Sequence, residues 1–377
     1  ADFIVSFIRG AKEHHGLDID YCGIWNETQH DLEWIKLLRR TLDRGGLSKI
    51  KIVASDQVGT WDIVDAMERD PELKNAVYAV GVHYSKQQSS EAAKSSGKPL
   101  WASEDGILAP YDDWRAAGAL AKLYNRNYIQ GRMTKTIIWS MVNAYYENLP
   151  WPDSGPLKAS SPWSGNYEVY PSLWTIAHTT QFAQPGWRYI DAACGLLRRG
   201  GSYVCLRSPE PDGDWSIIAE TADAKYPQTL VFRISGGLST KPLHVWRSDR
   251  TEQFARINDL PIADGLATLE LEPGCIYSFT TTRGQRKGLV APPPKTDFPF
   301  PYRDDFEDSR AGGLPKYFSD QGGVFEAAER PGGGRCLRQT VDQCGIDWHY
   351  HPNPEPYTMI GSANWRDYQV ECEALVE

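Results

Sequence analysis

Short apolar runs alternate with amphipathic segments from residue 1 to about 185. We expect strands at 19–25, 50–54, 77–82, 98–102 and 134–141, and helices at 1–15, 30–44, 62–68, 112–129 and 170–183. Such alternation predicts a parallel α/β sheet, either a barrel or a doubly wound sheet. No Gly-x-Gly-x-x-Gly or phosphate loop accompanies the strands, which favours a (β/α)8 TIM barrel. Five strands are counted, so we expect three further N-terminal units upstream of residue 1.

The pattern changes beyond residue 185. Short apolar runs separated by Gly, Pro and Asp predict strands at 203–206, 215–219, 229–234, 243–246, 268–271 and 276–281. They indicate an antiparallel β-sandwich over 186–290. Residues 291–301 have the composition of a proline-rich linker. The rest, 302–377, ends in a strand-like stretch at 368–376 and is interpreted as the start of a truncated third β-domain.

Composition limits the classes of function. A net charge of −9 and a pI near 5.5 argue against a nucleic-acid partner, which requires a basic surface. No apolar run approaches the length of a transmembrane segment. The 7 cysteines form no Cys-x-x-Cys pair and no histidine stands at zinc-ligand spacing, so neither a metal nor another cofactor is expected.

Two glutamates carry the strongest chemical signal. Glu27 closes Ile-Trp-Asn-Glu and Glu104 lies in Leu-Trp-Ala-Ser-Glu-Asp, each directly after a predicted buried strand. Carboxylates at the carboxyl ends of two barrel strands are what glycoside cleavage requires, one as acid and base and the other as nucleophile. The alternatives are that Asn26 and Glu27 only cap the next helix and that Glu104 is a surface residue.

Weaker candidates surround this pair. His83 and Tyr84 end the strand between the two glutamates, and a hydrogen bond from either would orient Glu104. Trp139 lies near the end of the last predicted barrel strand and is placed to form a floor under a sugar ring, or else to fill the core. Asp56 also follows a strand and is a lower-ranked carboxylate candidate. The sequon Asn26-Glu27-Thr28 falls on the proposed site and is interpreted as a chance match.

Several motifs together resemble the galactosylceramidase family of glycoside hydrolases. The resemblance runs essentially from end to end, and Trp-Asn-Glu with His-Thr-Thr-Gln-Phe is its most specific part. The matching stretches are 17–27 (LDIDYCGIWNE), 100–105 (LWASED), 144–150 (AYYENLP), 162–165 (PWSG), 177–187 (AHTTQFAQPGW), 200–204 (GGSYV) and 320–326 (DQGGVFE).

The resemblance implies a TIM barrel, a β-sandwich and a lectin-like β-domain. It also implies a retaining exo-β-galactosidase that hydrolyses galactosylceramide or a related galactosphingolipid, with Glu27 as acid and base and Glu104 as nucleophile. By the same resemblance Asn26, Trp139, Trp151 and Trp348 contact or line the sugar site. A saposin-type lipid carrier is the implied partner, and the implied location is the lysosome for an animal protein and otherwise outside the cytoplasm.

One departure from the family concerns specificity. The sandwich loop that carries a sugar-contacting arginine in the family is short here, running from Glu220 to Leu230. The preference for galactosylceramide over other β-galactosides therefore stays open, as do three alternatives: another barrel glycosidase such as a β-glucosidase, a non-catalytic sugar-binding protein, and an inactive piece of an enzyme. Because five strands leave two open sheet edges, we expect residues 1–377 alone not to fold stably.

Overall fold

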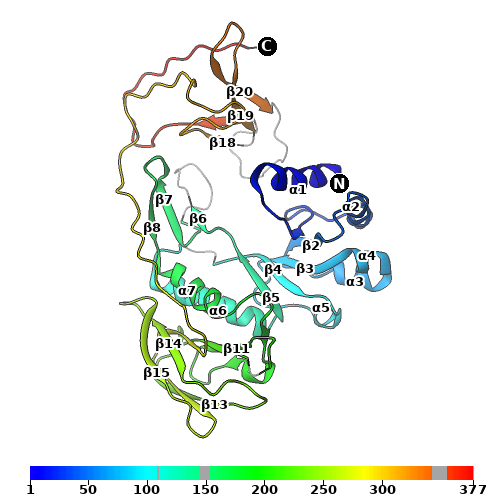
Figure 1. The fold of residues 1–377 in the computed structure, drawn as a ribbon, viewed down its shortest axis with the longest axis vertical. Coiled ribbons are helices and arrows are strands. Elements are labelled where there is room, and N and C mark those ends of the chain that lie inside the picture. The colour runs from blue at the N-terminus through cyan, green and yellow to red at the C-terminus, as the bar shows by residue number, and fades with distance from the viewer. Residues whose placement is uncertain (108–109, 144–152, 212, 322, 342–354, 377) are drawn as a thin grey trace. The chain divides into compact units, whose positions relative to one another are not determined.

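A computed structural model describes residues 1–107, 110–143, 153–211, 213–321, 323–341 and 355–376 (Figure 1). The chain forms two compact units. The first comprises residues 1–142, 153–157 and 169–289, and the second comprises 143–152, 158–168 and 290–377. The expected domain boundaries after residues 185, 290 and 301 stay predictions.

The first unit begins with a parallel α/β sheet, as the sequence predicts. Its five strands pair in chain order, β1-β2-β3-β4-β5, with every neighbouring pair parallel. The strands are β1 (Tyr21–Cys22), β2 (Lys51–Val58), β3 (Val77–His83), β4 (Leu100–Asp105) and β5 (Met133–Ile138). The helices are α1 (Asp2–His15), α2 (Leu32–Arg44), α3 (Ile63–Arg69), α4 (Pro71–Ala76), α5 (Glu91–Ser95) and α6 (Trp114–Ile129).

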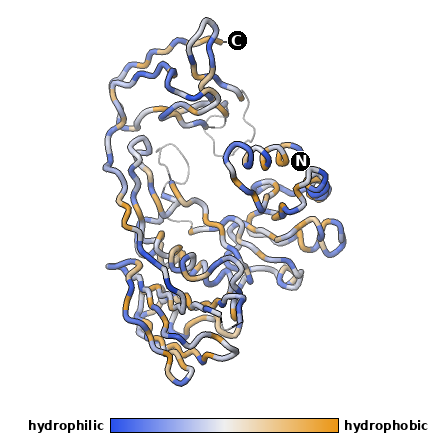
Figure 2. Tube along the Cα trace, viewed as in Figure 1, coloured by the Kyte–Doolittle hydropathy of each residue, from blue (hydrophilic) through white to orange (hydrophobic). Residues whose placement is uncertain are grey.

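The core of this part lies between the sheet and its helices. Ile35, Leu38 and Leu42 of α2 are fully buried, in one cluster with Ile52 of β2 and Val80 of β3. Side chains of successive strand residues point to opposite faces, so one face of each strand packs against helices. Hydrophobic residues therefore recur along the strands and alternate with hydrophilic ones along α1 and α2 (Figure 2).

The regular pairing is interrupted near the carboxyl ends of three strands. Register shifts occur between Ser55 and Gln57 of β2, between Val82 and His83 of β3, and between Ala102 and Asp105 of β4. Such irregularities re-aim side chains and are common beside active sites. They fall where Asp56, His83 and Glu104 lie.

The first unit continues into antiparallel strands, as expected. A seven-stranded sheet has the order β10-β11-β12-β17-β14-β15, with β9 paired to β11, and β13 pairs with β16. Their bounds are β9 (Arg188–Tyr189), β10 (Gly195–Leu196), β11 (Ser202–Arg207), β12 (Trp215–Glu220), β13 (Gln228–Arg233), β14 (Leu243–Ser248), β15 (Ala255–Leu260), β16 (Leu266–Leu271) and β17 (Ile276–Thr280).

Helices α6 and α7 (Pro171–Thr180) hold these strands to the rest of the unit. The Asn125 amide of α6 donates to the carbonyls of Ser202 and Ile218, both at 3.3 Å. His178 of α7 is fully buried and contacts the hydroxyls of Ser278 and Ser248 at 2.8 and 2.7 Å. The His-Thr-Thr-Gln-Phe motif thus supplies a buried polar connection between a helix and two strands.

The second unit contains short strands and an aromatic cluster. Phe298 is 4% exposed, and its ring meets those of Trp163, Tyr302, Tyr317 and Trp365. The strands are β18 (Ser319–Gln321), β19 (Val324–Glu329), β20 (Arg335–Val341) and β21 (Tyr357–Met359). A further small sheet consists of β6 (Val142–Asn143), β7 (Leu157–Ser161) and β8 (Asn166–Val169).

Some predicted elements differ from those observed. The strand expected at 19–25 is reduced to β1, and the strand expected at 368–376 is wrong, because those residues have no regular structure as far as 376. Val370 and Leu375 are 74% and 72% exposed, and apolar residues form a strand only where a partner strand accepts them. Helix α4 was missed, although Asp70 caps it and Pro71 begins it. Among the described helices, none is long and apolar enough to cross a membrane.

The burial of His178 predicts a pH dependence of stability. Burial lowers its pKa from 6.5 to about 3, so the unfolded chain binds a proton below pH 6.5 that the folded chain does not. Stability should therefore fall as the pH drops from 6.5 towards 3, by about 2–3 kcal/mol from this residue at pH 4.5. In the full-length protein, His178→Gln should lower the melting temperature at pH 7 but flatten its decline between pH 7 and 4.5. His15→Gln, an exposed control, should leave the decline unchanged, and equal slopes in all three proteins would contradict the assignment.

Candidate active site

Glu27 lies in the loop that follows β1. Its backbone N–H donates to the carbonyl of Asp56 at 2.9 Å, which attaches the loop to the neighbouring strand β2. The Glu27 side chain is 30% exposed, so its carboxylate contacts both solvent and protein. The loop is therefore held by its backbone while the carboxyl group stays accessible.

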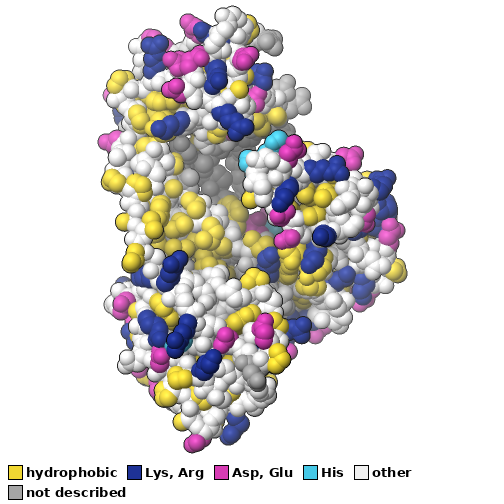
Figure 3. Space-filling view, viewed as in Figure 1, with side chains coloured by type: hydrophobic (Ala, Val, Ile, Leu, Met, Phe, Trp, Pro, Cys, Tyr) yellow, Lys and Arg dark blue, Asp and Glu magenta, His cyan; other side chains and the backbone are white. Residues whose placement is uncertain are grey.

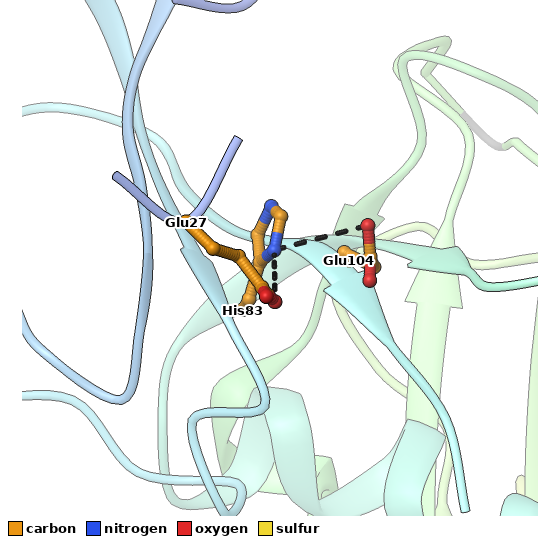
Figure 4. Close-up of side chains that lie close together, drawn as sticks. All are labelled: Glu27, His83 and Glu104. Atoms are coloured by element: carbon orange, nitrogen blue, oxygen red, sulfur yellow. Dashed lines mark hydrogen bonds and ion pairs between the residues drawn. The ribbon is translucent and has the colours of Figure 1, made fainter. Parts of the chain in front are cut away.

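His83, at the end of β3, lies between the two glutamates. Its Nδ1 atom is 3.0 Å from Glu27 Oε1 and 3.8 Å from Glu104 Oε2, so both carboxylates face the same ring nitrogen (Figure 4). The His83 side chain is only 4% exposed. With a proton on Nδ1, the ring donates a hydrogen bond to Glu27 and attracts Glu104.

Glu104, in β4, accepts a hydrogen bond from the residue that follows His83. The Tyr84 hydroxyl donates to Glu104 Oε1 at 3.0 Å. Burial raises the pKa of Glu104, whereas a charged His83 and the Tyr84 hydrogen bond lower it. Burial and the nearby Glu104 also raise the pKa of Tyr84, so this hydroxyl keeps its proton and acts as a donor.

The spacing of the two carboxyl groups is the main geometric result. One ligand atom each of Glu27, His83 and Glu104 lies within 4.8 Å of the others. Retaining glycosidases hold their two carboxyl groups about 5–5.5 Å apart, whereas inverting enzymes separate them by roughly 6.5–9.5 Å. The site therefore has the close spacing that suits direct attack by one carboxylate.

Backbone conformation at the strand ends is unusual. Glu27, Asp56 and Tyr84 all have positive φ angles, of 50°, 56° and 46°. Residues other than glycine rarely adopt this left-handed region, and such conformations persist where surrounding contacts fix them, often at active sites. Three adjacent strand ends share this feature.

The side chains of Glu27, His83 and Glu104 are of types that bind divalent cations. Carboxylates and imidazole are common metal ligands. A cation here would displace the 3.0 Å contact between His83 Nδ1 and Glu27 Oε1, because it would need the same two atoms. The hydrogen-bonded arrangement satisfies these groups without an ion, and the expectation of no metal stays a prediction.

The remaining predicted site residues have less defined places. Asn26 is exposed, and its carbonyl accepts from the Thr28 hydroxyl at 3.0 Å. Trp139 follows β5, donates its backbone N–H to the Asp105 carbonyl at 3.0 Å and is 40% exposed. Trp151 and Trp348 lie outside the described residues. The roles assigned to all these residues stay predictions.

The structure adds two residues to the site. The carboxylate of Asp56, ranked low from the sequence, accepts from the Ser103 hydroxyl at 2.5 Å and lies 3.8 Å from His83 Nε2. Ser103 was not identified, because a serine before a glutamate carries no signal by itself. The position of Asp56 after a predicted strand was the available signal, but its neighbours follow from strand pairing alone.

The sequence is similar to those of known glycoside hydrolases. Residues 1–181 match the model of glycosyl hydrolase family 59. The whole chain is 36% identical to galactocerebrosidase of Danio rerio and 38% identical to that of Homo sapiens, of which it covers 60% and 58%. A putative galactocerebrosidase of Caenorhabditis elegans is 25% identical over 96% of the chain, which covers 55% of it. The chain thus spans little more than half the length of these curated relatives.

Solved structures share the fold at low sequence identity. A family 30 subfamily 8 xylanase from Clostridium acetobutylicum superposes with a TM-score of 0.61 at 18% identity, over 74% of this chain and 70% of that one. Xylanase C from Talaromyces cellulolyticus gives a TM-score of 0.60 at 14% identity, over 75% and 66%. The chain is therefore similar along its length to galactocerebrosidases, and its residues 1–181 resemble glycosyl hydrolase family 59.

Proposed function

We propose that this chain carries the catalytic centre of a retaining exo-β-galactosidase that hydrolyses galactosylceramide or a related galactosphingolipid. The observation that supports it most directly is the pair Glu27 and Glu104, which approach one buried histidine within 4.8 Å. The galactocerebrosidases to which the chain is similar support the choice of sugar and lipid.

The proposed reaction has two displacements. Glu104 attacks the anomeric carbon and forms an ester to the sugar, while the glycosidic C–O bond breaks and its oxygen takes the proton of Glu27. Glu27, now a carboxylate, removes a proton from water, whose oxygen attacks the same carbon and releases Glu104. Tyr84 orients Glu104 through its 3.0 Å hydrogen bond, and His83 contacts Glu27. Asn26 and Trp139 are proposed sugar contacts.

Apolar surface next to the site supports a lipid aglycone. Beyond β4, which carries Glu104, the next strand β5 leads to Trp139, Met141 and Val142, which are 40%, 40% and 53% exposed. Hydrophobic side chains gather along this path on the visible face (Figure 3). Exposed apolar patches commonly mark binding surfaces, and a ceramide has the matching chemistry.

The finer expectations are part of the same proposal. The five parallel strands would belong to a (β/α)8 barrel, and residues 302–377 would begin a lectin-like domain. A saposin-type carrier would present the lipid, and an animal protein of this kind would act in the lysosome. These statements rest on the similarity to galactocerebrosidases along the chain.

Mechanism-based labelling tests the sugar, the mechanism and the nucleophile together. Incubation of the full-length protein with 2-deoxy-2-fluoro-β-galactosyl fluoride should add one fluorogalactosyl group to the peptide that contains Glu104. The fluorine at C2 slows both formation and hydrolysis of the glycosyl ester, whereas the anomeric fluoride is a good leaving group and keeps formation faster than hydrolysis. Intact and peptide mass spectrometry would detect it. Glu104→Gln should abolish the adduct, and prior dialysis against EDTA should not.

The other outcomes have distinct meanings. Labelling by the gluco-configured reagent alone would indicate a β-glucosidase on the same scaffold. A folded protein that neither reagent labels would contradict the retaining mechanism. Sugar binding that persists without any turnover would indicate the non-catalytic alternative.

Removal of the Tyr84 hydroxyl tests the electrostatics around Glu104. Tyr84→Phe should raise the pKa of Glu104, because the lost hydrogen bond favours the carboxylate. The acid limb of the pH profile of kcat/KM for an aryl β-galactoside should therefore move to higher pH, and the maximum should fall roughly 10- to 100-fold. Tyr226→Phe, at a tyrosine that is 64% exposed, should change neither quantity. An acid limb that does not shift in Tyr84→Phe would show that Tyr84 does not affect the ionisation of Glu104, and would contradict the prediction.

A further inference from the structure

We propose that Asp56 is a positioning residue for this reaction, which holds the Glu27 loop and faces His83 from the side opposite the two glutamates. The inference rests on the proposed function and adds a third carboxylate to it. The proposed two-step reaction gives Asp56 no role. The importance of Asp56 follows from its contacts with three neighbouring segments.

The first contact attaches the loop of the proposed acid. The Asp56 carbonyl accepts the backbone N–H of Glu27 at 2.9 Å. The Asp56 carboxylate also accepts a hydrogen bond from the backbone N–H of Ile24, earlier in the same loop. Because β1 has only two residues, regular strand pairing does not reach Glu27. These two bonds, together with the 3.1 Å hydrogen bond from the Gln57 amide to the Thr28 carbonyl, therefore hold the loop in position.

The second contact reaches the strand of the proposed nucleophile. The Ser103 hydroxyl donates to Asp56 Oδ1 at 2.5 Å, and Ser103 immediately precedes Glu104. This bond crosses from β2 to β4 over the intervening strand β3. One carboxylate thus connects the segments that carry both glutamates.

The third contact concerns the histidine between them. Asp56 Oδ1 lies 3.8 Å from His83 Nε2, while the Nδ1 atom of the same ring faces Glu27 and Glu104. At 3.8 Å the contact is too long for a hydrogen bond, and it is an electrostatic attraction when Nε2 carries a proton. Since the His83 side chain is 4% exposed and that of Asp56 is 14% exposed, solvent screens this attraction only weakly. The ring is therefore held with Nδ1 towards the glutamates.

Two glycines provide the space for this carboxylate. A Cβ atom at Gly81 of β3 would lie 2.8 Å from Asp56 Oδ1 and 2.6 Å from Ser103 Oγ. A Cβ atom at Gly23 would lie 2.6 Å from Asp56 Oδ2. A side chain at either position would force the Asp56 carboxylate to shift, and a glycine within a strand, as at Gly81, often marks a close approach of this kind. The positive φ of 56° at Asp56, tolerated by Asp and Asn, directs the side chain into this space.

The dependence on leaving group distinguishes positioning from general stability. Asp56→Asn keeps the size and the tolerance of positive φ but removes the charge. Phenyl β-galactoside needs a proton from Glu27 in the first step, whereas 2,4-dinitrophenyl β-galactoside needs almost none. With the full-length protein, kcat/KM should fall roughly 10- to 100-fold for the phenyl substrate and less than about fivefold for the dinitrophenyl one.

Matched variants make the outcome decisive. Asp62→Asn, the same substitution at an exposed aspartate after the same strand, should leave both values of kcat/KM unchanged. Equal losses of Asp56→Asn on the two galactosides, with a lowered melting temperature, would show a purely structural role and overturn the inference. Unchanged kinetics would overturn it as well.

Failure of the proposed function is separable from failure of this inference. A wild-type protein that cleaves neither galactoside contradicts the function itself. In that case the crystal structure of Asp56→Asn tests the positioning role. Loss of the 3.0 Å contact between His83 Nδ1 and Glu27 Oε1 would support it, and an unchanged contact would overturn it.

Discussion

Parallel pairing of five strands in chain order is the constraint on which the site depends. Because neighbouring parallel strands run in one direction, their carboxyl ends reach the same edge of the sheet. Residues as far apart in sequence as Glu27 and Glu104 thereby come within 3.0 and 3.8 Å of one histidine nitrogen. The register shifts at the same ends then turn individual side chains away from regular alternation and towards each other.

The site gathers three carboxyl groups around one buried imidazole. Glu27 and Glu104 face its Nδ1 atom, and Asp56 faces its Nε2 atom. Burial raises the pKa of Glu104 and of Asp56, while His83 lowers both, so the histidine limits the cost of placing several negative charges together. Hydrogen bonds from Tyr84 and Ser103 act in the same direction. Each carboxylate has a different set of partners, and different partners are what separate an acid from a nucleophile in sites that contain two carboxyl groups.

The sheet that carries the site is also joined to the antiparallel strands by buried polar contacts. His178 contacts serines of two strands, and Asn125 donates to carbonyls of two others. A buried polar group left unpaired is costly, so such contacts fix one arrangement of helix and sheet more firmly than apolar packing does. The presence of the His-Thr-Thr-Gln-Phe motif therefore has a structural explanation that is independent of catalysis.

The sequence by itself determined the order of strands and helices in 1–185 and the change to antiparallel strands beyond it, because hydrophobic periodicity is a local property. It also identified Glu27, His83, Tyr84 and Glu104 as strand-end residues. Only the tertiary structure decided which of these side chains contact one another. Strand register, and the space that Gly23 and Gly81 leave for the Asp56 carboxylate, depend on contacts between segments that are distant in sequence. For the same reason the sequence ranked Asp56 low and missed Ser103, and it predicted at 368–376 a strand that finds no partner among the described residues.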